Sequence, residues 1–148
     1  MIKVICVGKI KEKFYKEGVK EYEKRLSKYT KIQIIEVNDE KEEIALKKES
    51  ENIMKHINDK DYVITLEIDG KSLSSVEFAE KLDKTLMVNS NIAFVIGGSY
   101  GLGNEVKQRS DYQLSFSKLT FPHQLFRVMF LEQLYRCFKI NNKETYHK

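Results

Sequence analysis

The sequence has little proline and cysteine and no long apolar run, and each scarcity excludes a class of protein. The sequence has one proline in 148 residues, so it has no proline-rich linker, and it contains no low-complexity tract of another composition. The two cysteines, Cys6 and Cys137, lie far apart and outside any C-x-x-C spacing, so we interpret both as reduced thiols without a catalytic role. No apolar stretch approaches the roughly 20 residues that a membrane-spanning helix needs. We therefore do not expect a membrane protein.

The first residues also lack the features of an export signal. Their apolar stretch, 2–7, is too short for the core of a signal peptide, and no small-residue cleavage pattern follows it. We therefore expect a cytoplasmic protein. A length of 148 residues is typical of one domain, so we expect a single domain over 1–148.

Charge is unevenly distributed along the chain. Residues 1–31 hold ten basic and four acidic residues, residues 32–90 hold eight and fourteen, and residues 91–148 hold eight and four. Basic ends suit a surface that faces a polyanion, although a solvated lysine-rich helix explains the first block equally well. Three of the four arginines lie in the last third, which indicates a site there because the guanidinium fork suits phosphates and base edges.

Apolar runs rich in Ile, Val and Phe alternate with stretches of helical periodicity. These runs predict strands at 2–7, 32–37, 62–68 and 92–96, and a shorter fifth strand at 112–116. Helical spacing of apolar residues predicts helices over 15–29 and 41–57, and a capping box at Ser74 and Glu77 begins a third. Because strands separated by helices cannot pair as hairpins, we expect an α/β fold with a mostly parallel sheet covered by helices on both faces.

A glycine-rich loop follows the fourth expected strand. Four glycines within residues 97–103 allow the backbone to approach a ligand without obstruction by Cβ atoms. A tight strand-to-helix turn without a ligand is the alternative. The spacing matches neither G-x-G-x-x-G nor the P-loop pattern, which argues against a classical NAD or P-loop site.

A second candidate site lies where the last helix begins. Pro122 suits the first position of a helix, and His123 and Arg127 are neighbours on one face near its electropositive end. A lone histidine there is more often a surface or packing residue, and His56 and His147 complete no metal-ligand spacing, so we expect no metal. Because helix 122–140 is apolar on nearly every face, we expect it to pack on the sheet and on a second subunit, as a homodimer.

The tail, residues 141–148, ends in Tyr146, His147 and Lys148. Chain ends are commonly disordered, which is the alternative interpretation. An aromatic ring can stack on a base, an imidazole can hydrogen-bond or accept a proton, and an amine can pair with phosphate. We therefore take Tyr146 and Lys148, together with Arg136, as candidate RNA-binding residues.

These features together resemble the large-subunit ribosomal RNA methyltransferase H family over the whole chain. Small departures exist at Glu67, Leu119 and Cys137, where Asp, Met and Ala are common, and none removes a polar group with an expected role in the chemistry. Five ordered segments carry the resemblance: LEIDGK at 66–71 with the serines at 74–75, FVIGG at 94–98, LTFPHQ at 119–124, EQLYR at 132–136 and YHK at 146–148.

The resemblance implies both a fold and a reaction. Members of that family belong to the SPOUT class, so it implies a trefoil-knotted α/β fold, a homodimer, and methylation of a pseudouridine N3 in 23S ribosomal RNA with S-adenosylmethionine. Only the resemblance supports the knot, because general topology rules argue against threaded chains. With no appended RNA-binding domain expected, we favour the assembled ribosome as substrate.

The resemblance also implies which residues bind the cofactor and which take part in the reaction. It places S-adenosylmethionine at Leu66, Gly98, Ser117, Lys118, Leu119, Thr120, Phe121 and Pro122. We expect His123 or His147 to accept the N3 proton and Arg127 to stabilise the resulting anion. A dehydrogenase or nucleotide-binding enzyme, and a non-catalytic ribosome-binding protein, are the two rival classes; binding of S-adenosylmethionine would separate all three.

Overall fold

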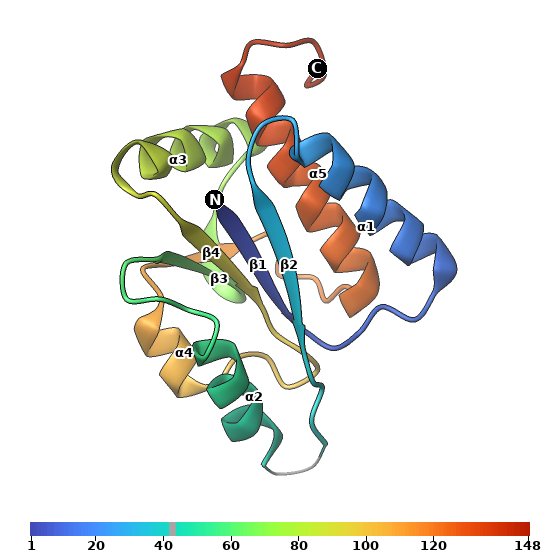
Figure 1. Cartoon of the computed structure of the whole chain (residues 1–148), viewed down its shortest axis with the longest axis vertical. Coiled ribbons are helices and arrows are strands. Elements are labelled where there is room, and N and C mark those ends of the chain that lie inside the picture. The colour runs from blue at the N-terminus through green and yellow to red at the C-terminus, as the bar shows by residue number, and fades with distance from the viewer. Residues whose placement is uncertain (42–43) are drawn as a thin grey trace.

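Strands and helices alternate along the chain in the computed structural model, which describes residues 1–41 and 44–148 (Figure 1). The strands are β1 (Ile2–Val7), β2 (Ile32–Val37), β3 (Tyr62–Ser72), β4 (Ile92–Ile96) and β5 (Tyr112–Ser115). The helices are α1 (Lys13–Leu26), α2 (Ala45–Met54), α3 (Ser75–Val88), α4 (Asn104–Arg109) and α5 (His123–Asn141). All strand pairs are parallel, in the order β2-β1-β4-β3-β5, which confirms the expected fold class.

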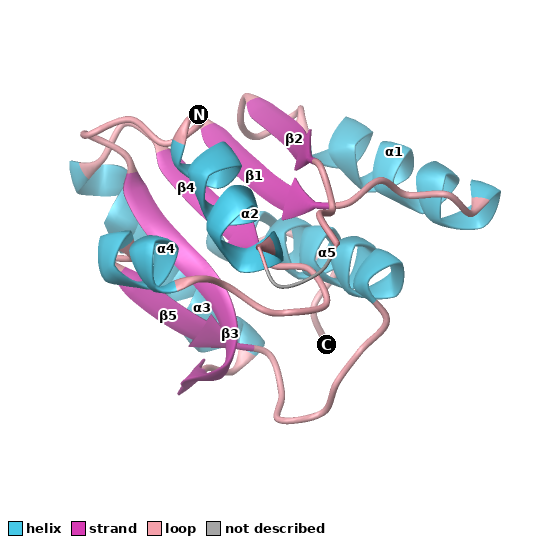
Figure 2. Cartoon of the chain, turned by 90° about the horizontal axis from the view of Figure 1, so that it is seen from below, coloured by secondary structure: helices cyan, strands magenta, loops and turns pink. Residues whose placement is uncertain are grey.

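Successive side chains of a strand point to opposite faces of the sheet, and both faces are buried. In β1, Val4 and Cys6 join a cluster formed with α1, α3 and α5, whereas Ile5 and Val7 join a second cluster formed with α2 and α4. Figure 2 shows the corresponding division of the helices between the two faces. β1 and β4 are therefore covered on both sides; β4 is a continuous apolar run, and β1 is apolar except for the buried Lys3.

Several boundaries differ from expectation: α1 begins at Lys13 and ends at Leu26, so Tyr29 lies beyond it, and β5 ends one residue early, at Ser115. β3 continues to Ser72, and its pairing with β5 shifts register between Leu66 and Lys71. Gly70 permits this irregularity, because a Cβ atom there would lie 2.8 Å from the backbone of Gln113. Pro122 caps α5 instead of occupying its first helical position. The predicted helix over 41–57 corresponds to α2, and its residues 42–43 lie outside the described residues.

The capping box that predicts the third helix is present. The Ser74 hydroxyl accepts a hydrogen bond from the Glu77 backbone N–H at 3.1 Å, and the Glu77 carboxylate accepts one from the Ser74 N–H at 2.8 Å. These two bonds satisfy N–H groups that a helix start leaves unpaired. The sequence therefore specifies where α3 begins.

Helix α5 lies between α1 and α3 on one face of the sheet (Figure 1). Phe130, Leu131 and Leu134 are fully buried there. α1 and α3 thus cover part of the apolar surface that the sequence assigns to a second subunit, whereas Leu125 and Met129 remain half-buried. The homodimer stays a prediction, and so does the trefoil knot, because strand order and pairing do not define how the chain threads. Across the described residues no helix is long and apolar enough to cross a membrane.

Candidate functional site

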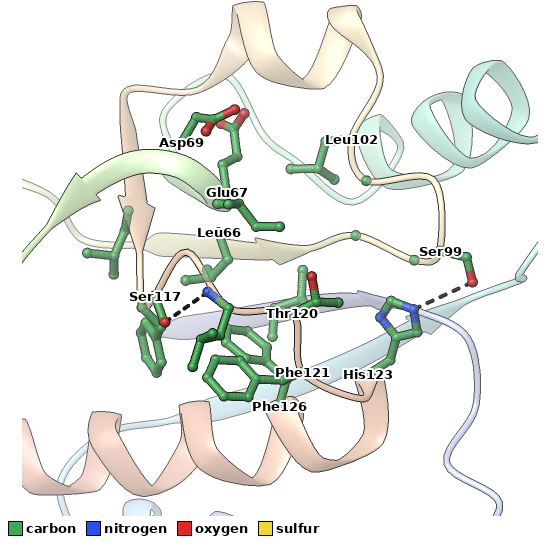
Figure 3. A pocket seen from close by; sticks show the side chains of 18 of the residues that line it. Leu66, Glu67, Asp69, Ser99, Leu102, Ser117, Thr120, Phe121, His123 and Phe126 are labelled. Atoms are coloured by element: carbon green, nitrogen blue, oxygen red, sulfur yellow. Dashed lines mark hydrogen bonds between the residues drawn. The ribbon is translucent and has the colours of Figure 1, made fainter.

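A cavity of about 330 Å³ opens at the carboxyl ends of β3, β4 and β5. Three segments form its walls: the later part of β3, the glycine loop that follows β4, and the loop that joins β5 to α5 (Figure 3). In parallel α/β sheets, ligands bind outside the carboxyl ends of the strands. The volume lies within the range of roughly 300–1,000 Å³ that is typical of small-molecule sites.

The glycine loop turns back on itself at the cavity wall. The Gly101 N–H donates to the Gly98 carbonyl at 3.0 Å, and Gly101 has a φ of 74°, a left-handed conformation that favours glycine. A Cβ atom on Gly98 would lie 2.8 Å from Cγ1 of Val7, in β1. The missing side chain at Gly98 is therefore required by packing of the loop on the sheet. The backbone of Gly98 also lines the cavity, and its proximity to a ligand stays a prediction.

The loop between β5 and α5 supplies the opposite wall. The Ser117 hydroxyl accepts a hydrogen bond from the Leu119 N–H at 3.0 Å, which tightens the turn. Below it, the Phe126 ring lies 5.1 Å from the Phe116 ring and 6.1 Å from the Phe121 ring, so aromatic side chains form an apolar floor.

Most of the residues expected to bind the cofactor meet in this cavity. Those that line it are Leu66, Gly98, Ser117, Leu119, Thr120 and Phe121. Lys118 and Pro122 belong to the same loop, yet both are exposed and do not line the cavity. The assignment of these eight residues to the cofactor stays a prediction.

Two carboxylates and a lysine line the cavity without having been expected there: Glu67, Asp69 and Lys107. The Thr65 hydroxyl donates to Oε2 of Glu67 at 2.6 Å, and Nζ of Lys107 lies 3.8 Å from Oε1. These contacts fix the direction of the Glu67 side chain. Glu67 and Asp69 follow a buried apolar strand in the sequence. Their position at its carboxyl end is the signal that could have identified these two residues.

His123 stands at the rim of the cavity, on the first turn of α5 (Figure 3). Its Nε2 lies 3.5 Å from the Ser99 hydroxyl, across from the glycine loop. The imidazole is exposed, so a substrate can reach it. The structure therefore places His123 at the opening of the cavity, and its role as proton acceptor stays a prediction.

Arg127 lies one turn later and points away from the cavity. Only 3% of the residue is exposed; its Nη1 donates to Oε2 of Glu36 at 2.6 Å and its Nη2 to the Gly8 carbonyl at 3.0 Å. The guanidinium thus ties the start of α5 to β1 and β2. The structure does not bring Arg127 to a reacting base, because these bonds would have to break first.

The tail residues cluster at the far end of α5. The Tyr146 hydroxyl donates to Glu132 at 2.7 Å, its ring packs 5.0 Å from that of Tyr135, and Nη1 of Arg136 lies 3.1 Å from Nδ1 of His147. Burial, and then the bond to Glu132, raise the pKa of Tyr146. The end of the chain is therefore docked, and the Tyr146 ring and the Arg136 guanidinium are engaged within the chain, whereas Lys148 is exposed.

The tail cannot reach the cavity of its own chain. Arg136 follows His123 by thirteen residues of continuous helix, which corresponds to about 20 Å at ~1.5 Å per residue. The structure brings Arg136, Tyr146 and His147 together with one another, but not with His123. A tail can contribute to a cavity only if that cavity belongs to another copy.

Possible metal ligands and cysteine thiols are two further features of the described residues. They contain no group of three His, Cys, Asp or Glu side chains that could hold a metal ion. Cys6 and Cys137 are free and buried, and burial raises the pKa of Cys6 to about 12. A thiolate nucleophile is therefore not available near neutral pH.

Comparison with known proteins decides the family. A family model described as "Predicted SPOUT methyltransferase" matches residues 1–147. The chain belongs to the SPOUT methyltransferase family. This membership confirms the expectation of a methyltransferase and favours it over a dehydrogenase or a non-catalytic ribosome-binding protein.

Curated relatives agree with this membership. The ribosomal RNA large subunit methyltransferase H of Caldicellulosiruptor saccharolyticus is 53% identical over the full length of both chains. The protein of the same description from Clostridium botulinum strain Hall is 55% identical over 99% of both chains. The resemblance to that family is thereby confirmed.

A solved structure supports the fold of this SPOUT family member. It is described as a probable methylase family protein from Haemophilus influenzae, and it superposes with a TM-score of 0.53 at 18% sequence identity. The superposition covers 96% of this chain and 66% of that chain.

Proposed function

We propose that this methyltransferase transfers the methyl group of S-adenosylmethionine to N3 of a pseudouridine in 23S ribosomal RNA, on the assembled cytoplasmic ribosome. One observation carries the proposal: a single cavity at the carboxyl ends of three parallel strands joins the glycine loop, the β5–α5 loop and an exposed histidine. Relatives described as ribosomal RNA large subunit methyltransferases support the substrate class.

The lining of the cavity fits S-adenosylmethionine. Leu66, Leu102 and Phe126 offer an apolar slot for adenine, and the glycine loop offers backbone N–H and C=O partners. The carboxylates of Glu67 and Asp69 can accept hydrogen bonds from ribose hydroxyls or an ammonium group. Bound S-adenosylmethionine supplies an electrophilic methyl group, because its sulfonium is already activated.

The protein contributes mainly placement and a proton acceptor. Holding the acceptor nitrogen in line with the S–CH3 bond can lower the barrier by as much as ~7–11 kcal/mol. N3 forms the new bond with its electron pair, the S–CH3 pair stays on sulfur, and the N3 proton passes to His123 directly or through water. In this proposal Arg127 acts as a positioning residue, because its bonds to β1 and β2 hold the first turns of α5 that carry His123.

The outer face of α1 supports an RNA substrate. Four exposed lysines follow one another at four-residue intervals: Lys16, Lys20, Lys24 and Lys28. Among the described residues, no acidic side chain forms a salt bridge with any of them. Like charges at this spacing cost roughly 0.2–0.5 kcal/mol per pair, a cost that phosphate groups would relieve. The amide oxygen of Gln124, beside His123, accepts hydrogen bonds from the N–H groups of Lys11 and Glu12. The lysines therefore start near the cavity and lead away from it.

A direct assay tests the proposed reaction. Ribosomes from a strain that lacks the modification are incubated with the protein and methyl-labelled S-adenosylmethionine, and the nucleosides are analysed by mass spectrometry. We expect label in N3-methylpseudouridine of 23S RNA, with much faster transfer to assembled ribosomes than to free RNA. Label in another nucleoside, or none on either substrate, would overturn the proposal.

The glycine loop gives the first prediction for the cofactor. Gly98→Val places methyl groups where a Cβ atom alone would already lie 2.8 Å from Val7, so the loop has to move. We expect affinity for S-adenosylmethionine, measured by calorimetry, to fall more than tenfold and the melting temperature to drop.

Gly101→Ala is the matched control for this change. Its Cβ atom meets no protein atom within 4 Å, so within the protein the variant carries left-handed backbone strain of about 1–2 kcal/mol without a clash with β1. Because Gly101 also lines the cavity, a loss of affinity in this variant as well would point to direct contact with the ligand. Unchanged affinity in Gly98→Val would remove the glycine loop from the cofactor site.

A second prediction concerns the proposed homodimer. Apolar groups remain at the surface beside the cavity, including Leu119, which is 70% exposed, and the half-buried Met129 of α5. Exposed apolar patches of this kind mark interaction surfaces. Light scattering should give about twice the chain mass of 17.4 kDa, and Met129→Glu should shift the protein toward monomer.

Met87→Glu is the control, because Met87 is 75% exposed and lies in the last turn of α3. It should leave the mass unchanged. A wild-type monomer at high micromolar concentration would contradict the dimer.

A further inference from the structure

Tyr100 lies at the tip of the glycine loop, beside the cavity. The Gly101 N–H donates to the Gly98 carbonyl at 3.0 Å, which closes a four-residue turn with Ser99 and Tyr100 at its central positions. Ser99 and Gly101 line the cavity, whereas Tyr100 between them does not. The turn therefore holds the Tyr100 side chain next to the cavity but outside it.

The Tyr100 ring is exposed and packs on no other aromatic ring or cation among the described residues. Each of the other seven tyrosines in the chain packs against an aromatic ring or faces a cationic side chain. Tyr100 is 54% exposed, and across the same residues its hydroxyl forms no hydrogen bond. Both the face of the ring and its hydroxyl are thus available to a ligand.

The same turn lies against the start of α5. The hydroxyl of Ser99, the residue before Tyr100, lies 3.5 Å from Nε2 of His123 (Figure 3). A base that enters the cavity has to approach this rim, where the proposed proton acceptor stands. Tyr100 is therefore placed to meet the nucleotides that flank that base.

Positive charge accompanies the ring at this rim. The N–H of Lys11 donates to the side chain of Gln124 at 2.8 Å, one residue after His123. Lys118 belongs to the loop that forms the wall opposite the glycine loop, and both lysine side chains are exposed. Exposed aromatic rings among basic residues are the combination with which proteins bind single-stranded nucleic acid. The surroundings of Tyr100 therefore favour RNA over an apolar partner.

We infer that Tyr100 stacks on the RNA base next to the target nucleotide and takes the place that the target base leaves when it enters the cavity. This inference rests on the proposed function. A base cannot reach a methyl donor inside a cavity while it is stacked between its neighbours, so it has to leave the stack. Its departure uncovers one face of the neighbouring base. An aromatic ring at the rim can cover that face whatever the base is, because every base has a π-face.

Binding to ribosomes tests this contact without any methyl transfer. Tyr100→Phe keeps the ring, Tyr100→Leu keeps an apolar side chain without a π-face, and Tyr100→Ala removes both. Cosedimentation with unmodified ribosomes is measured with S-adenosylhomocysteine in place of the methyl donor. We expect Tyr100→Phe to bind nearly as the wild type does, and the Leu and Ala variants to bind roughly 5- to 150-fold more weakly, the loss typical of one stacked base. Equal affinity in all four proteins, or no binding by the wild type, would overturn the inference.

The salt dependence of binding separates stacking from charge. Stacking releases no counterions, so Tyr100→Ala should lower the affinity by the same factor at every salt concentration. Lys11→Gln is the contrasting variant, and it should make the salt dependence less steep because one phosphate contact is lost. A less steep salt dependence in Tyr100→Ala would show that its effect acts through charge and would overturn the inference.

Kinetics and cofactor binding then distinguish RNA from cofactor as the partner of Tyr100. Tyr100→Ala should raise the KM for ribosomes at least fivefold, while calorimetry gives an unchanged affinity for S-adenosylmethionine and the melting temperature stays similar. A loss of cofactor affinity with unchanged ribosome binding would place the ring over the cofactor and overturn the inference. A wild type that binds ribosomes through Tyr100 but transfers no methyl group would contradict the proposed function and leave the contact with RNA in place.

Discussion

Replacing His123 by alanine is expected to reduce methyl transfer to ribosomes by ~10²–10⁴-fold, the usual contribution of a positioned acid–base group. His123 lies at the cavity rim, and its only polar contact among the described residues is the 3.5 Å approach to Ser99, so the fold does not depend on it. The affinity for S-adenosylmethionine should change only a few-fold. Initial rates with saturating cofactor, together with calorimetry of cofactor binding, check both expectations.

His56→Ala is the control for this variant. His56 is exposed just after α2, and only its backbone carbonyl is used, by the Lys3 ammonium at 2.8 Å. Its loss should leave the rate unchanged. Full activity of His123→Ala would show that the N3 proton leaves by another route.

The positions of most strands in the sequence could be predicted, because they follow from local pattern. β1, β2 and β4 begin and end where their apolar runs begin and end, and the capping box marks the start of α3. The extension of β3 could not be predicted, because Asp69 and Gly70 are typical of a turn. Only the close approach of β5 shows that Gly70 lies within a strand.

Two of the three segments that line the cavity could be picked out from the sequence, but the long-range contacts of their residues could not. Sequence spacing places Arg127 on one helix face with His123, yet its partners Glu36 and Gly8 lie 91 and 119 positions away in the chain. Such long-range pairs leave no periodic signal, and they decide whether an arginine binds a ligand or holds the fold. Tyr146 and Arg136 show the same effect over shorter separations, since both engage Glu132 and leave less of each side chain free for RNA.

Deleting Tyr146 to Lys148 is expected to lower methyl transfer at least a hundredfold while the cofactor still binds. The deletion removes one hydrogen bond to Glu132 and one half-buried ring, which together stabilise the fold by about 1–3 kcal/mol. Tyr146 contacts α5 at Glu132, nine residues or about 14 Å beyond His123, and none of the deleted residues lines the cavity, so calorimetry should give a nearly unchanged affinity for S-adenosylmethionine. Removing Lys148 alone is the control and should cost little beyond one salt-sensitive phosphate contact.

Mixing two inactive chains shows where the tail acts. If the proposed dimer completes each cavity with the tail of the other copy, a subunit lacking residues 146–148 keeps its own His123, and a His123→Ala partner supplies it with an intact tail. Co-refolding the two chains in equal amounts gives heterodimers in about half of the molecules. Each heterodimer has one complete site out of two, so activity should recover to about a quarter of the wild-type value. A tail that works on its own chain gives no recovery, because neither subunit then holds both parts. The recovered activity should also disappear when Met129→Glu is added to both chains, since the complete site exists only in the dimer.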